Sequence, residues 1–148
     1  MCYAKVILKA YPQIDNVVKY MDETVKEKCL VSFSDKMPAS RSVDDIVNLI
    51  ENKQKLIVLK EKTRNVLKRL SDEEIAMINY KYFKNRSIGG FDYTSRNYFR
   101  RQHKVIEHVK ELLGYIDLSE QKFLKEYASI PFIKYVSSSL DDDVVSFY

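Results

Sequence analysis

Glycine and proline are scarce in this chain, with three of each among 148 residues. Tight hairpin turns need residues that accept positive φ angles, and loops that cradle phosphate groups need several glycines close together. The shortage therefore disfavours a β-rich fold and a Gly-rich nucleotide-binding loop. It predicts an all-α protein.

Cysteine is also rare, and the two cysteines, Cys2 and Cys29, lack the paired spacing of a metal site. The two histidines, His103 and His108, are five residues apart, so they do not share one face of a helix. Neither cysteine has an evident histidine partner for nucleophilic catalysis. We therefore expect no metal site, no cofactor and no enzymatic activity.

Long apolar runs are missing too. No segment approaches the ~20 apolar residues that a membrane-spanning helix needs, and the N-terminus lacks the pattern of a signal peptide. With 45% hydrophobic and 31% charged residues, the chain has the composition of a globular domain. These features predict a cytoplasmic protein without a membrane partner.

The charge is unevenly distributed, although the net charge is only +4. Residues 51–70 carry seven basic and two acidic side chains, and residues 80–110 carry eight and two. Residues 111–148 are acidic and include Asp141–Asp143, which we interpret as a solvated tail rather than a cation site. The two basic segments favour an anionic partner for the middle of the chain.

A long helix is predicted for Ser42–Leu70, because this segment contains neither glycine nor proline and Ser42 can cap it. It follows a helix that starts near Pro12 and a loop over residues 32–41. The long helix repeats apolar or small side chains every seven residues, at Leu49, Leu56, Thr63 and Leu70. Such a stripe packs either inside one chain or against a second copy. Lysines at 53 and 60 interrupt the seam, so intramolecular packing is preferred over a homodimer through the 42–70 helix.

A second helix is predicted to start at Ser71, because Ser71-Asp72-Glu73-Glu74 matches the capping-box pattern Ser-x-x-Glu. A polar turn with the only Gly-Gly pair of the chain, Gly89-Gly90, follows it. Two shorter helices are expected at residues 119–127 and 131–139, after which the chain frays.

Between them lies a basic amphipathic helix, TSRNYFRRQHKVIEHVKELLG, which covers residues 94–114. Helical spacing places Tyr98 and Phe99 with the apolar residues of its buried face, and Gly114 is expected to end it. The outward face is basic near its start and mixed in sign further on. A recognition helix concentrates its base-reading and phosphate-reading groups in the same way, in the turns that enter the major groove. Arginine, which dominates here, can bind guanine with two hydrogen bonds.

These two helices resemble region four of bacterial sigma factors and the related phage late-gene regulators of the ArpU and RinA type. The likeness rests on LSDEEIAMINYKYFKNRS, residues 70–87, and on SRNYFRR, residues 95–101. It covers residues 70–113 only, and the connection at 84–94 is shorter than in the family pattern. A counterpart of sigma region two is not evident in residues 1–69. A regulator is therefore favoured over a stand-alone initiation factor.

The resemblance implies a phage-type or bacterial transcription regulator with a helix-turn-helix that binds duplex DNA, and RNA polymerase as a further partner. Its domains would be an N-terminal helical region (1–69), a helix-turn-helix module (70–114) and short C-terminal helices with an acidic tail (115–148). An alternative is a helical protein–protein interaction module that does not bind DNA, in which the long helix is the working surface. The residues expected to contact DNA are Arg86, Thr94, Ser95, Arg96, Asn97, Arg100, Arg101 and Lys104.

Overall fold

The computed structural model describes the backbone of residues 2–32, 39–83 and 96–145, and the side chains of 2–30, 43–83 and 97–140. The described residues form helices and no strand, which confirms the predicted all-α fold. In chain order the helices are α1 (Tyr3–Ala10), a short 3-10 helix η1 (Tyr11–Gln13), α2 (Ile14–Ser32), α3 (Ala39–Leu67), α4 (Asp72–Lys81), α5 (Arg96–Tyr115), α6 (Glu120–Glu126) and α7 (Pro131–Val145).

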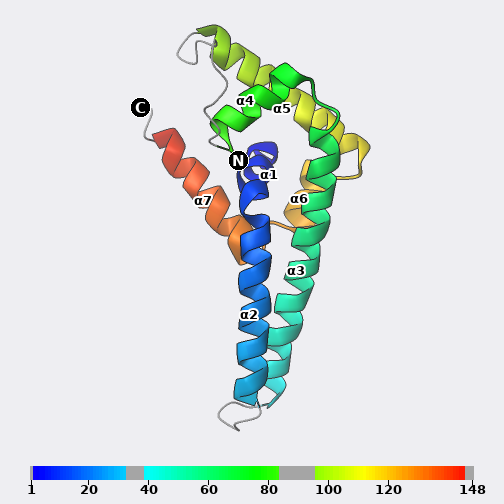
Figure 1. Cartoon of the computed structure of the whole chain (residues 1–148), viewed down its shortest axis with the longest axis vertical. Helices are drawn as coiled ribbons and strands as arrows, with labels where there is room; N and C mark the ends of the chain where they lie inside the picture. Colours follow the sequence, from blue (N-terminus) through cyan, green and yellow to red (C-terminus); the bar gives the residue numbers. More distant parts are fainter. Residues whose placement is uncertain (1, 33–38, 84–95, 146–148) are drawn as a thin grey trace.

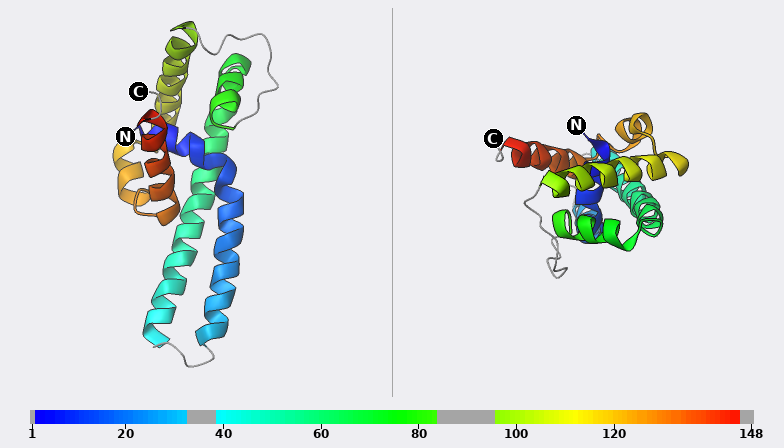
Figure 2. Two further views of the ribbon diagram at one scale, coloured as in Figure 1. Left: turned by 90° about the vertical axis from the view of Figure 1, so that its left-hand side faces the viewer. Right: turned by 90° about the horizontal axis from the view of Figure 1, so that it is seen from above.

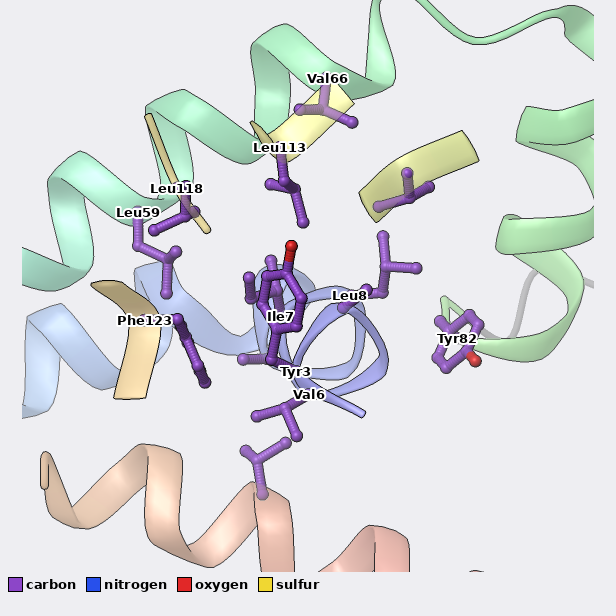
Figure 3. Close-up of a cluster of buried hydrophobic side chains, with 14 of the residues drawn as sticks. Tyr3, Val6, Ile7, Leu8, Leu59, Val66, Tyr82, Leu113, Leu118 and Phe123 are labelled. Carbon is purple, nitrogen blue, oxygen red and sulfur yellow. The ribbon is translucent and has the colours of Figure 1, made fainter. Parts of the chain in front are cut away.

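The first helix, α1, forms the centre of the hydrophobic core. Six of its eight residues are buried, so it is apolar around most of its circumference, as expected of a helix enclosed by others. It packs against α5 and α7. Figure 3 shows Ile7 and Leu8 surrounded by Leu113 of α5, Leu59 of α3 and Phe123 of α6. The core therefore joins the first ten residues to the C-terminal helices, across the boundary at residue 69 that the sequence predicts.

Helices α2 and α3 form an antiparallel hairpin that extends away from the other helices (Figures 1 and 2). Among the described side chains, three ion pairs cross between them, Asp15–Lys60 and Asp22–Lys53 at 2.5 Å and Asp45–Lys28 at 3.4 Å. The pairing runs in opposite directions along the two helices, which fixes their antiparallel register. Lys53 and Lys60, which interrupt the predicted seam, are thus paired with aspartates of α2.

The seven-residue stripe of α3 packs inside the chain, as predicted. Leu56, Thr63 and Leu70 are buried, and Leu49 packs on the core cluster. The Thr63 hydroxyl donates a hydrogen bond to the Leu59 carbonyl at 2.8 Å, so its burial leaves the hydroxyl satisfied. The predicted boundaries are displaced by three residues, because α3 starts at Ala39 and residues 68–70 form a turn. Of the loop predicted at 32–41, residues 33–38 lie outside the described residues.

Helix α5 ends later than predicted, and Gly114 is not its terminator. Gly114 lies within the last helical turn, and Asp117 adopts the left-handed conformation with φ of 61°. The Leu118 N–H donates to the Leu113 carbonyl at 2.9 Å, and the Asp117 N–H donates to the Gly114 carbonyl at 3.4 Å. Both bonds belong to a Schellman motif, and the buried Leu113 and Leu118 supply its apolar contact. Aspartate tolerates this conformation better than most side chains, so glycine was not needed.

The two C-terminal helices form close to their predicted positions. Ser119 caps α6, and its hydroxyl accepts a hydrogen bond from the Lys122 N–H at 3.3 Å. Helix α7 starts at Pro131, where the missing N–H of proline costs nothing, and it continues to Val145 rather than fraying after Ser139.

Candidate nucleic-acid interface

The sequence-predicted interface is built on α4 and α5, and α4 starts as predicted. The Ser71 hydroxyl accepts a hydrogen bond from the Glu74 N–H at 3.2 Å, and the Glu74 carboxylate accepts one from the Ser71 N–H at 3.0 Å. This reciprocal pair is a complete capping box. Met77 and Ile78 are buried on the core side of α4. The acidic first turn therefore has a fixed position relative to the core.

The buried face of α5 holds Tyr98, Gln102, Val105 and the apolar residues that follow at helical spacing. Gln102 is only 4% exposed, and its amide nitrogen donates to the Met77 carbonyl and to the Tyr98 hydroxyl, both at 3.1 Å. This amide ties α5 to α4 through the backbone of α4. An interhelical hydrogen bond of this kind is not visible in the sequence.

The prediction that Phe99 faces the core was wrong. Its side chain is 56% exposed, whereas the adjacent Tyr98 is buried. Tyr98 meets Tyr80 of α4 edge to face, with ring centroids 6.1 Å apart. Because successive helical residues point about 100° apart, the tyrosine that occupies the contact with α4 directs its neighbour toward solvent.

Helices α4 and α5 cross, with α4 packed against α5 (Figure 1). Glu74, Met77 and Tyr80, in that order along α4, contact residues in descending order along α5, namely His108, Gln102 and Tyr98. In a simple helix-turn-helix the two helices are joined by a turn of three or four residues. The connection here spans residues 82–95. The shortened supporting segment predicted at 84–94 lies outside the described residues.

The residues predicted to contact DNA fall into two groups. Arg86, Thr94 and Ser95 lie outside the described residues, and for Arg96 only the backbone, at the start of α5, is described. The remaining four are all exposed on the first turns of α5, namely Asn97, Arg100, Arg101 and Lys104. The Arg100 guanidinium lies 3.5 Å from the Asn97 amide oxygen, a long hydrogen bond within one turn. The chain thus displays two polar contact types, amide and guanidinium, on the same surface.

Two acidic residues of α4 border this basic surface and were not anticipated as part of it. The Arg101 guanidinium lies 2.6 Å from the Glu73 carboxylate, and His108 Nδ1 lies 2.6 Å from the Glu74 carboxylate. A shallow depression between them is lined by Glu73, Glu74, Arg101 and Lys104. From the sequence, both glutamates were expected only as part of the acidic first turn of a helix. The pairs depend on the packing of α4 on α5, so no sequence spacing could have revealed them.

The Glu74 carboxylate joins the capping box to α5. Burial acts to raise its pKa, but the hydrogen bonds from the Ser71 N–H and from His108 outweigh burial and lower the pKa below the ordinary value of 4.5. At neutral pH this group is therefore a carboxylate held by donors from two helices. It stabilises the arrangement that presents the basic face of α5.

The described side chains, those of residues 2–30, 43–83 and 97–140, include no group of three or more His, Cys, Asp or Glu that could hold a metal ion. None of the helices described is long and apolar enough to cross a membrane. Comparison with family models, with curated proteins and with solved structures gives no match to this chain.

Proposed function

We propose that this protein is a transcription regulator that binds duplex DNA through the N-terminal half of α5. The observation that carries the proposal is the division of this helix into two faces. One face is buried with the core, and the other exposes Asn97, Arg100, Arg101 and Lys104 to solvent. Phosphate contacts by lysine and arginine supply much of the affinity of DNA-binding proteins, and arginine and asparagine also read base edges.

The position of α5 in the molecule supports the proposal. The helix lies across the end opposite the hairpin connection (Figure 1), and the described residues leave its outer side chains exposed to a rod-shaped partner. On its buried side, Gln102 binds the backbone of α4, and the capping-box residue Glu74 of α4 contacts His108 of α5. A helix held in this way loses little conformational entropy when it binds DNA.

The ion pair between Arg101 and Glu73 has a consequence for binding. Both side chains are about half exposed, at 50% and 61%, so water screens the pair and its contribution to stability is small. A DNA phosphate can therefore replace Glu73 as the partner of Arg101. Glu73→Gln should then raise the affinity for DNA a few-fold, because the competing carboxylate is gone.

Fluorescence anisotropy of the full chain with duplex DNA from around its own gene tests the proposal. The variant Arg96→Ala/Arg100→Ala/Arg101→Ala should lose most of the binding, since each base-reading arginine contributes roughly 1–3 kcal/mol. Lys104→Ala should weaken binding to all sequences about equally, as expected of a phosphate contact.

A charge-matched control separates a local interface from general attraction. Lys26, Lys125 and Lys134 are exposed on other helices, and the Lys26→Ala/Lys125→Ala/Lys134→Ala variant loses the same three charges. This variant should keep nearly all of the affinity. Equal losses in the two triple variants, or no binding by the unmodified chain, would reject the proposal.

The alternative function is a helical interaction module that does not bind DNA. It is favoured by apolar side chains that the α2–α3 hairpin leaves exposed, among them Leu30, Val43 and Ile50. Such a module, with RNA polymerase or another protein as its partner, would show weak and non-specific DNA binding or none. The anisotropy experiment therefore distinguishes the two functions.

A further inference from the structure

Helix α3 carries a second apolar stripe that differs from the one packed in the core. It consists of side chains that are 40–55% exposed, at Val43, Val47, Ile50, Ile57 and Val58. Ile50 and Ile57 each follow a leucine of the inner stripe by one residue, so they point about 100° further round the helix. The second stripe therefore lies beside the contact with α2 and faces solvent.

The spacing of this outer stripe is that of a coiled-coil seam. Val43, Val47, Ile50, Gln54 and Ile57 are separated by alternating steps of four and three residues. Glutamine is the single polar residue in the series, and Glu61 would be the next member. The apolar part spans residues 43–58, about 23 Å of helix at 1.5 Å per residue.

Charged side chains along one edge of the outer stripe indicate what covers it. Asp44, Glu51, Lys55 and Lys62 lie on the same edge, because they are separated by seven, four and seven residues. The edge is acidic in its first half and basic in its second half. Reversed end to end, the edge matches itself in charge, with Asp44 opposite Lys62 and Glu51 opposite Lys55.

We propose that a second copy of this chain packs antiparallel against the outer stripe of α3. Aligned by the apolar residues, Val47 meets Ile57 of the second copy and Ile50 meets Gln54 of the second copy. In this alignment the two charged pairs are offset from direct opposition by two residues, about 3 Å along the helix, a distance that their long side chains can span. Two copies related by a twofold axis present the same surface to each other, and the self-complementary edge fits that symmetry. A parallel pair would instead place Glu51 against Glu51 and Lys55 against Lys55 across the axis.

The two copies lie with their helical bodies at opposite ends. The twofold axis passes near residue 52. The C-terminal ends of α3, which join the helical bodies, are therefore about 45 Å apart in the two copies, at 1.5 Å per residue. The apolar contact is short compared with standard interfaces, and we expect a dissociation constant in the micromolar range. The dimer does not require DNA, so its presence and DNA binding are separate questions.

Sedimentation equilibrium of the full chain without DNA, from ~5 to ~500 µM, tests the proposal. The apparent mass should rise from 17.5 kDa toward twice that value with concentration. Ile50→Glu/Ile57→Glu should keep the chain monomeric throughout, while its helical circular dichroism stays unchanged because both positions are exposed. The matched control is Leu124→Glu, an exposed leucine on α6, which should leave the dimer intact.

A charge swap tests both that the two α3 helices pair antiparallel and that the partner is a second copy of the chain. Glu51→Lys and Lys55→Glu should each raise the dissociation constant at least about tenfold, and the double variant should return it close to the original value. A chain that stays monomeric at every concentration would overturn the proposal and leave the stripe to a different protein. So would a dimer that Ile50→Glu/Ile57→Glu leaves intact, or a double variant that is no better than the single ones.

Discussion

The α2–α3 hairpin and the helical body around α1 differ in how many neighbours each helix has. In the body, α1 packs on α5 and α7 and Tyr3 contacts Phe123 of α6, so nearly every apolar side chain on α1 is buried. In the hairpin, each helix packs mainly on the other, so one stripe is buried and the opposite faces meet solvent. The exposure of an apolar residue thus depends on the number of packed neighbours more than on the residue itself.

The two regions also differ in the interactions that stabilise their folded structure. Buried apolar area dominates in the body, where Ile7, Leu113 and Phe123 are almost completely inaccessible. The described part of the hairpin adds three ion pairs, whose side chains are 30–74% exposed. Exposed pairs contribute at most about 1 kcal/mol each. We therefore expect the body to dominate the free energy of unfolding.

The largest effect is expected from Phe123→Ala in the body. Phe123 is fully buried, and its ring lies 5.9 Å from that of Tyr3 and 5.8 Å from that of Tyr127, centroid to centroid. The variant should lose about 3–5 kcal/mol of unfolding free energy in urea denaturation. Leu124→Ala, one residue further on the exposed face of α6, should lose less than about 1 kcal/mol. Similar losses in both variants would mean that α6 does not bury this face.

A smaller contrast is expected between two neighbouring residues of the hairpin. Leu56→Ala removes a fully buried side chain of the inner stripe and should cost about 2–5 kcal/mol. Ile57→Ala changes the outer stripe and should cost less than about 1 kcal/mol in dilute solution, where the chain is monomeric. Urea denaturation at low micromolar concentration measures both. If Ile57→Ala cost as much as Leu56→Ala, the outer stripe would have to be covered within the monomer.

The pH dependence of stability provides a further test of the link between α4 and α5. Because folding lowers the pKa of Glu74 below 4.5, its contribution is fully present above that value. The contribution is lost as the pH falls through the lower pKa of the folded state. Glu74→Gln should therefore show a smaller fall in unfolding free energy between pH 5 and pH 3 than the unmodified chain. Parallel curves for the two proteins would show that the folded state does not favour the carboxylate.

The smallest effect is expected from Tyr82→Phe at the end of α4. The Tyr82 ring is buried, and its hydroxyl has no hydrogen-bond partner among the described residues. Burial also raises the pKa of this hydroxyl, which stays protonated. Removing a buried group without a partner should leave the melting temperature unchanged or raise it, by the equivalent of at most about 1 kcal/mol. A clear decrease would show that the hydroxyl has a partner.

Local features of the fold could be predicted from the sequence, because they depend on residues close together in the chain. The capping box at Ser71, the short helix that follows Ser119 and the inner stripe of α3 are of this kind. The central place of α1 could not be predicted, since its partners are distant in the sequence. Contacts between helices also decided that Tyr98 faces the core and Phe99 the solvent.

For the candidate interface, the sequence indicated the basic face of α5 but not the acidic residues beside it. The spacing of Arg100, Arg101 and Lys104 is enough to place them away from the apolar stripe, and all three are exposed. The pairing of Arg101 with Glu73 depends on the packing of α4 on α5. DNA binding itself stays a prediction, because the fold class alone does not determine it.

The salt dependence of DNA binding tests this central proposal most directly. The logarithm of the binding constant is measured against the logarithm of the salt concentration, for the unmodified chain and for the Arg96→Ala/Arg100→Ala/Arg101→Ala variant. Each phosphate neutralised contributes about −0.9 to the slope. We expect a steep slope for the unmodified chain and a clearly shallower one for the variant. Equal slopes for the two proteins would show that DNA does not bind at this face of α5.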